Sequence, residues 1–134
     1  MSAALRGDAA TTRIPVRWRD CDALGHVHHS VFLVYLEEGR DAFLRHALGI
    51  ADPMYVVVRL AVDLKGGIDR LTSAVHVDTS VARVGRSSIA LRERILTEQR
   101  KELAESETTI VWWDSAAGTP RELTTHERAL LMGA

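Results

Sequence analysis

Hydrophobic and polar residues alternate near the start of the chain with the period of a half-buried β-strand. Within residues 12–19, Ile14, Val16 and Trp18 fall on one face and arginines fall on the other. Pro15 cannot donate a hydrogen bond to a neighbouring strand, which favours an edge position or a bulge. The pattern therefore predicts a first strand at the edge of a sheet.

A helical pattern follows this strand. From about Ser30 to Leu48, apolar residues cover most of the circumference of a predicted helix, and Gly49 supplies a C-terminal stop. A helix of this length measures ~28 Å, and one that is apolar on most sides must be largely wrapped by other elements. Its charged residues are expected on a solvent or interface stripe, with (i, i+3) pairing of Glu37 and Arg40. The members of this stripe are Glu37, Glu38, Arg40 and Asp41.

Four more strand patterns lie C-terminal to the helix. They cover residues 54–64, 72–84, 87–97 and 103–113, and the short breaks between them suit antiparallel hairpins. One early strand, one long helix and four consecutive strands predict an α+β fold in which a meander sheet curls around the helix. Residues 123–132 favour a short terminal helix.

Length and composition place the chain among single-domain globular proteins. Its 134 residues can bury a core, so residues 11–134 are expected to form one domain and residues 1–10 a short disordered arm. No apolar run approaches the ~20 residues of a membrane-spanning helix, and the first ten residues lack the pattern of a secretory signal. We therefore expect a cytoplasmic protein without a membrane span.

Charge and cysteine content argue against two other classes. With 17 basic and 18 acidic residues and no basic block, the chain lacks the charge distribution of a nucleic-acid binder. Cys21 is the single cysteine, which excludes an intramolecular disulfide and a cysteine-rich metal site. Nucleic acid is therefore not expected as a partner.

The candidate chemistry is concentrated in residues 20–29, which read Asp-Cys-Asp-Ala-Leu-Gly-His-Val-His-His. Asp22 lies in the predicted turn before the helix, so its carboxylate can project toward the helix N-terminus, where unpaired N–H groups and the helix dipole favour negative charge. An acyl oxygen bound at such a place would be stabilised as it becomes an oxyanion. Asp20 is interpreted as a turn or capping residue.

This segment resembles the signature of the hotdog-fold acyl-CoA thioesterases of the 4-hydroxybenzoyl-CoA thioesterase type. That signature reads roughly Asp-x-Asp-x-x-Gly-His-Val-Asn-Asn, followed by an aromatic-rich helix ending in Glu-Glu-Ala-Arg. Residues 84–88 also look like the family's Gly-Arg-Ser-Ser turn, and residues 114–120 look like its hairpin before the terminal helix. The chain departs from the family where His28-His29 replaces Asn-Asn and where residues 65–72 replace a segment that contains proline. The resemblance implies the hotdog fold.

The resemblance also implies roles for individual residues. Asp22 would act as nucleophile or as general base toward water, and the backbone N–H of His29 would donate to the oxyanion. His26 would help to fix the loop or hydrogen-bond the carboxylate or the water. Gly25 would permit a close approach of backbone and substrate that a bulkier residue would obstruct.

Coenzyme A would enter as part of the substrate, and its phosphates need cationic partners. Arg86, at the turn that matches the family, is the preferred candidate together with its two serine neighbours. The candidate substrate-binding residues are Arg59, Lys65, Arg83, Arg86, Ser87 and Ser88. Neither a metal nor another cofactor is expected, because the three histidines lack the (i, i+4) spacing of a helical zinc site.

The expected function is hydrolysis of an acyl- or aroyl-CoA thioester, or of an acyl carrier protein thioester, to a free acid and a thiol. By the same resemblance, the enzyme would be a homodimer or homotetramer with sites between subunits. Two alternatives stay open: a hotdog hydratase or dehydratase that uses Asp22 and His26, and a protein that binds acyl thioesters without turning them over.

Overall fold

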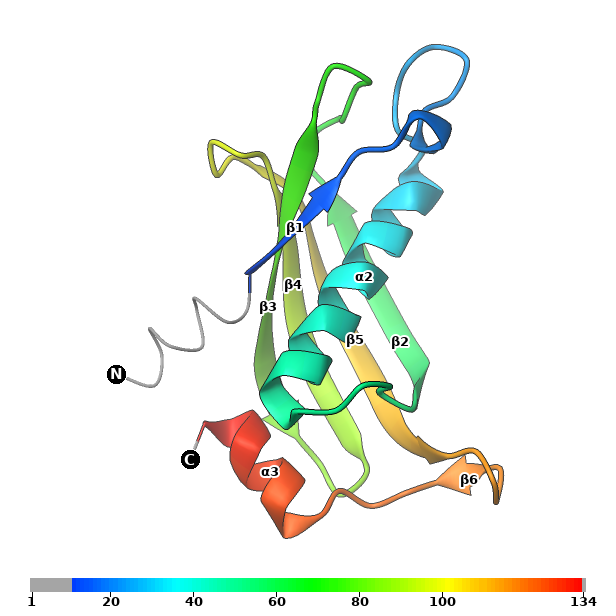
Figure 1. Cartoon of the computed structure of the whole chain (residues 1–134), viewed down its shortest axis with the longest axis vertical. Helices are drawn as coiled ribbons and strands as arrows, with labels where there is room; N and C mark the ends of the chain where they lie inside the picture. The colour runs from blue at the N-terminus through cyan, green and yellow to red at the C-terminus, as the bar shows by residue number, and fades with distance from the viewer. Residues whose placement is uncertain (1–10, 134) are drawn as a thin grey trace.

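The computed structural model describes residues 11–133, which form an antiparallel sheet and two α-helices (Figure 1). In chain order the elements are β1 (Thr11–Pro15), the short 3-10 helix η1 (Trp18–Asp20), α2 (His29–Leu48), β2 (Tyr55–Leu64), β3 (Ala74–Val84), β4 (Ser88–Leu96), β5 (Glu102–Asp114), β6 (Thr119–Pro120) and α3 (Thr125–Met132). The sheet curls around α2, which confirms the predicted α+β arrangement. The predicted N-terminal arm lies outside the described residues.

The strands of the sheet follow the order β1-β3-β4-β5-β2, with β6 paired to the end of β5. The four consecutive strands are present and β3, β4 and β5 form the predicted meander, but β2 pairs with β5 and not with β3, so the meander does not include β2 as predicted. The reason lies in residues 65–73, which do not form a hairpin. Within them, the carbonyl of Ile68 accepts a hydrogen bond from the backbone N–H of Val27, and the chain crosses from the edge strand β2 to β3, which lies between β1 and β4.

The first strand has the predicted edge position but is shorter than the alternation suggested. It ends at Pro15, and Trp18 begins a single 3-10 turn in which its side chain is 81% exposed. The turn forms because the carboxylate of Asp20 accepts a hydrogen bond from the backbone N–H of Arg17, at 2.9 Å. Alternation in residues 16–19 therefore reflects a capped turn and not a continued strand.

One face of α2 packs into the concave side of the sheet. Its buried residues recur at helical spacing and are Phe32, Tyr35, Leu36, Gly39, Arg40, Phe43, Leu44 and Leu48. The helix ends at Gly49, whose φ of +65° confirms the predicted C-terminal stop. Leu33 and Val34, on the other side, are exposed. The helix is thus covered on one face only, which leaves part of its apolar surface without a partner among residues 11–133.

Arg40 corrects the expectation of a surface stripe, because its side chain is buried and not solvated. Its Nε donates to Oε2 of Glu93 at 2.7 Å, and its Nη2 donates to Oε1 at 3.0 Å. Glu93 also accepts hydrogen bonds from Ser106 and Thr108 on β5. The predicted Glu37–Arg40 pair is therefore wrong, and Arg40 links α2 to two strands of the sheet.

Gly39 allows α2 to approach β3 closely. A Cβ atom built at this position would lie 2.6 Å from the Cβ of Val77, a distance that non-bonded atoms do not reach. Because a β-branched residue in a strand has little freedom at its own Cβ, a side chain at position 39 would force the helix away from the sheet.

We expect Gly39→Ala to destabilise the fold. Replacing glycine by alanine inside a helix contributes about 1 kcal/mol of favourable propensity, but overpacking a core costs about 1–3 kcal/mol, and the contact with Val77 places this substitution at the upper end. Unfolding by urea, followed by circular dichroism, measures the difference. Gly67→Ala is the control, since a Cβ atom there meets nothing within 4 Å. A more stable Gly39→Ala variant would contradict the packing argument.

No helix within residues 11–133 combines the length and the apolar character needed to cross a membrane.

Candidate active site

Residues 21–28 form a loop between η1 and α2 that is organised around Asp22. Its Oδ1 atom accepts hydrogen bonds from the backbone N–H groups of Leu24, at 2.9 Å, and His26, at 3.1 Å. The N–H of Asp22 donates to the carbonyl of His26, and the N–H of Gly25 donates to the carbonyl of Asp22. Gly25 adopts a φ of +80°, which closes the turn at little cost only for glycine.

These contacts keep Asp22 ionised. The hydrogen bond from the His26 N–H lowers the pKa of the Asp22 carboxyl most strongly, and the bond from Leu24 and the nearby His26 and His28 side chains act in the same direction. Asp22 is exposed, and no hydrogen bond from residues 11–133 engages its Oδ2 atom. One carboxylate oxygen is thus held by the loop while the other faces outward.

The helix that follows begins with a histidine cap. His28 precedes α2, and its Nδ1 accepts the backbone N–H of Ser30 at 3.1 Å and lies 2.8 Å from the Ser30 hydroxyl. Asparagine is preferred at this N-cap position because its side-chain oxygen can accept the same backbone N–H. His28 therefore keeps the capping function although it replaces the first asparagine of the family's Asn-Asn. His29 is the first helical residue, and the N–H of such a residue has no acceptor within its own helix.

The segment 68–71 lies against the Asp22 loop. The N–H of Val27 donates to Ile68 at 2.8 Å, and the N–H of Arg70 donates to Gly25 at 3.0 Å. A Cβ atom on Gly25 would lie 3.3 Å from Nε of Arg70, so both space and backbone conformation favour glycine. The contact of His26 with Asp22 comes from its backbone, and a role for its imidazole stays a prediction.

His26, His28 and His29 do not form a metal-binding cluster with Asp, Glu or Cys side chains of residues 11–133. The rings of His28 and His29 lie 4.0 Å apart, but no group of three or more His, Cys, Asp or Glu residues in positions 11–133 could hold a metal ion.

The predicted substrate-binding residues lie at different places on the protomer. Lys65 is at the same end as Asp22, with its ammonium held by Glu105 at 2.9 Å and Glu102 at 3.4 Å. Arg59 lies exposed on the edge strand β2. Arg86 and Ser87 lie in the turn between β3 and β4, at the end where β3 finishes, and Ser88 is the first residue of β4.

Asp22 and the Arg86 turn are far apart within one protomer. Strand β3 begins at Ala74, opposite Pro15 and close to the Asp22 loop, and ends at Val84. The ten steps of about 3.4 Å along this strand separate its ends by roughly 34 Å. Figure 1 shows the same separation, with the loop before α2 at one end and α3 and β6 at the other. One chain alone does not bring the two groups of predicted site residues together.

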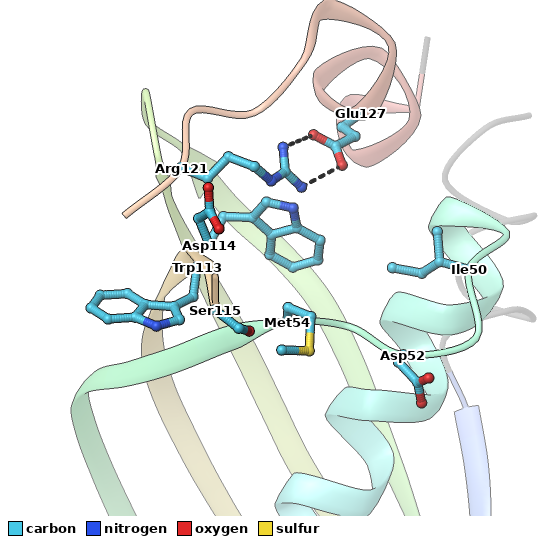
Figure 2. A pocket seen from close by; sticks show the side chains of 9 residues that line it. Ile50, Asp52, Met54, Trp113, Asp114, Ser115, Arg121 and Glu127 are labelled. Atoms are coloured by element: carbon cyan, nitrogen blue, oxygen red, sulfur yellow. Dashed lines mark hydrogen bonds and ion pairs between the residues drawn. The ribbon is translucent and has the colours of Figure 1, made fainter. Parts of the chain in front are cut away.

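A surface pocket of about 440 Å³ adjoins the Arg86 end (Figure 2). Its lining residues are Ile50, Asp52, Met54, Trp112, Trp113, Asp114, Ser115, Arg121 and Glu127. Arg121 forms two hydrogen bonds to Glu127 and lies over the ring of Trp112, at 5.4 Å. The backbone N–H of Trp112 donates to the carbonyl of Ser87, which links the turn to the pocket wall. Sequence patterns gave no indication of this pocket, because its residues come from three separate segments.

A model of the thioesterase-like superfamily matches residues 16–129. The chain belongs to this superfamily. It is 29% identical over 119 residues to the acyl-CoA thioester hydrolase YbgC of Escherichia coli, covering 83% of this chain and 88% of that protein. Membership confirms the predicted class of enzyme, a thioester hydrolase.

Solved structures of thioesterases confirm the hotdog fold. A thioesterase from Thermus thermophilus, determined with coenzyme A and zinc, is 29% identical and superimposes with a TM-score of 0.76 over 90% of each chain. A predicted thioesterase from Bacillus stearothermophilus is 23% identical, with a TM-score of 0.80 over 91% of this chain and 92% of its own. The second likeness concerns the fold alone.

We expect His28→Ala to lower the free energy of unfolding by about 1 kcal/mol, the usual value of a lost N-cap. His28→Asn should keep most of the stability, because the asparagine oxygen can accept the Ser30 N–H. Urea unfolding measures both variants, and Thr124→Ala, which removes the cap of α3, gives a reference value from the same protein. Equal stability of His28→Ala and the wild type would show that the cap contributes nothing.

Proposed function

We propose that this superfamily member hydrolyses acyl-CoA thioesters, with Asp22 as nucleophile or general base and the backbone N–H of His29 as oxyanion donor. The observation that supports the proposal is an exposed carboxylate, bound by two backbone N–H groups that lower its pKa, on the loop that leads directly into the N-terminus of α2. A thioester carbonyl placed between the two would meet an attacking group on one side and a hydrogen-bond donor on the other.

Two routes lead to the same products. In the first, Oδ2 of Asp22 adds to the acyl carbon, the thiolate leaves, and water hydrolyses the acyl–aspartate anhydride to the free acid and the original carboxylate. In the second, Asp22 takes a proton from water as the hydroxide adds to the carbon, and the departing thiolate receives a proton. In both routes the carbonyl oxygen becomes negative and the His29 N–H stabilises it.

The proposal needs neither a metal nor a prosthetic group, and coenzyme A enters as part of the substrate. It extends to aroyl-CoA and to acyl carrier protein thioesters, since all of them present the same carbonyl to Asp22. The predicted cytoplasmic location stays a prediction.

The central test is release of thiol from short, long and aromatic acyl-CoAs by the wild type and by Asp22→Asn. The wild type should release thiol, and the folded variant should lose the activity because its amide neither attacks nor accepts a proton. Because the Asp22 pKa is lowered, kcat/KM should stay constant down to about pH 5 and fall only below the ordinary aspartate value of about 3.9.

Asp78→Asn is the control for this test. Asp78 lies on β3, on the face of the sheet that points away from α2, and it is bound by Arg94 and Arg100. This variant should keep the wild-type rate. A folded Asp22→Asn variant with full activity would remove the central claim. An enoyl thioester that loses its absorbance without thiol release would identify a hydratase, and thermal protection by acyl-CoA without either reaction would identify a binding protein.

We infer further that the enzyme is a homodimer, or a tetramer built from such dimers, joined through β2. This strand is at the edge of the sheet and pairs with β5 on one side only. It exposes large apolar side chains, and Val58 is 58% exposed. Long apolar edges of this kind associate with other strands. The exposed Leu33 and Val34 of α2 give a second reason to expect a partner surface.

A two-fold axis through β2 would bring the separated site residues together. Antiparallel pairing of two copies places the Tyr55 end of one β2 beside the opposite end of the partner's β2. Residues 65–71, next to the Asp22 loop, follow the Leu64 end, whereas the Arg86 turn and its pocket adjoin the Tyr55 end. Asp22 of one subunit would then face the Arg86 end of the other, as the predicted sites between subunits require.

Val58→Asp should convert the oligomer to a monomer, because pairing would bury two like charges at the interface. Light scattering coupled to size-exclusion chromatography measures the mass, and thiol release should disappear together with the oligomer. Ser80→Asp places the same charge on the exposed face of β3 and should leave the mass of the oligomer and the rate of thiol release unchanged. A wild-type monomer, or a Val58→Asp variant that stays oligomeric, would refute the interface.

A further inference from the structure

The turn before Asp22 is tied to α2 by a group of four side chains. Oδ2 of Asp20 accepts a hydrogen bond from the hydroxyl of Tyr35 at 2.7 Å, and also from the backbone N–H and Nε of Arg17 at 2.9 and 3.2 Å. The guanidinium of Arg17 then binds Glu38 through both of its Nη atoms, at 3.0 and 3.3 Å. Because Tyr35 and Glu38 both belong to α2, the contacts form a closed ring between η1 and the helix, which we call the Asp20 clamp.

The Asp20 clamp is partly shielded from water, and hydrogen bonds are electrostatically stronger where the local dielectric is low. Tyr35 is fully buried, and Arg17 lies over its ring at 5.9 Å. Burial alone would raise the pKa of Asp20, but the hydrogen bonds from Arg17 and Tyr35 outweigh it and hold the pKa below the ordinary value. Burial and the bond to Asp20 both raise the pKa of the Tyr35 hydroxyl, so it stays a donor. Asp20 therefore does more than shape its own turn, which was the role expected from sequence.

We propose that Asp20, Tyr35 and Arg17 are positioning residues for the thioester site, and that they set the position of Asp22 relative to the first N–H of α2. The inference rests on the proposed function of Asp22 and His29.

The covalent path from the clamp to Asp22 is short. Only Cys21 separates Asp20 from Asp22, so a shift of the η1 turn moves the carboxylate directly. At its other end the loop joins α2, where His28 caps the helix through Ser30. Its remaining backbone contacts outside the loop lead to residues 68–70, which are themselves a connecting segment and not part of a regular element. Tyr35 lies six residues after His29 on the same rigid helix, a rise of about 9 Å. The clamp thus fixes the attacking group and the oxyanion donor to one common element.

Small changes of this geometry have large kinetic effects. Displacement of a reacting group by about 1 Å can cost about 100-fold in rate. Tyr35→Phe removes the hydroxyl but keeps the ring in the core, and Asp20→Asn keeps the shape but weakens the acceptor. Each variant should lower kcat roughly 10- to 100-fold on the acyl-CoA that the wild type uses best, with KM unchanged.

A matched control separates positioning from general loss of stability. Asp78 accepts hydrogen bonds from the hydroxyl of Thr11 and from Arg100, as Asp20 does from Tyr35 and Arg17, but it lies on β3 away from the loop. Asp78→Asn should keep the wild-type kcat even if its melting temperature falls as far as that of Asp20→Asn. The two rate losses should not multiply in the double variant Tyr35→Phe/Asp20→Asn, because both changes act on the same hydrogen bond.

A second measurement does not depend on activity. In a ¹³C NMR titration of the wild type, the Asp22 carboxyl should titrate below its ordinary pKa because the Leu24 and His26 N–H groups bind it. In Tyr35→Phe the loop should loosen, its Asp22 pKa should rise toward the ordinary value, and amide hydrogen exchange should accelerate in residues 21–28. Neither quantity should change in Asp78→Asn.

The outcomes distinguish the two proposals. If the wild type releases no thiol from any acyl-CoA, the proposed function fails, and the titration and the exchange rates still decide whether the clamp orders the loop. If the wild type is active but Tyr35→Phe keeps its kcat, its Asp22 pKa and its exchange rates, the clamp is only a structural contact and the inference is overturned.

Discussion

The buried ion pair between Arg40 and Glu93 is the interaction on which the placement of α2 depends. Two charges inside a core carry a large desolvation cost, which is offset only when their hydrogen-bonding groups are well matched. Arg40 and Glu93 meet in a two-point contact, and Ser106 and Thr108 donate to the same carboxylate. Burial alone would lower the pKa of Arg40, but Glu93 raises it above its ordinary value, so the guanidinium stays charged. A helix shifted by one residue would lose this match, so α2 has one favourable register against the sheet.

This register fixes the geometry of the candidate site from a distance. The N–H of His29 lies eleven residues before Arg40, or about 16 Å along a rigid helix. Gly39 is next to Arg40 and lets the helix approach β3 closely enough for the ion pair to form. The ion pair of Arg40 therefore fixes the rigid helix near its middle, and this fixes the position of the helix N-terminus relative to the sheet. The Asp20 clamp and the loop of residues 21–28 are assembled against that point, which connects the packing of the core to the proposed chemistry.

Sequence patterns predicted the elements whose periodicity is local, and missed the features that depend on distant partners. The long helix and most strand positions follow from spacing within one segment, and the loop around Asp22 follows from a motif. Arg40 looked like a surface residue because its partner, Glu93, is 53 positions away, and Trp18 continued an alternation that a local cap interrupts. The crossing from β2 at one edge of the sheet to β3, beside β1, was missed for the same reason. A signal for the ion pair was present in β4, where Glu93 shares the alternating buried face of Ile89 and Leu91.

The exposure of Asp22 sets a physical requirement that the single chain does not meet. Electrostatic stabilisation of an oxyanion is weak in bulk water and strengthens when solvent is excluded. In the protomer, the carboxylate and the histidines around it face outward. Under the proposed mechanism the bound substrate or a second subunit would have to cover them, and the apolar edge of β2 is the surface proposed for a second subunit. Such a cover would tend to raise the pKa of Asp22 by removing water, while the N–H groups of Leu24 and His26 would hold it down. In the proposed assembled site, the two backbone hydrogen bonds would therefore keep the carboxylate ionised after water has left.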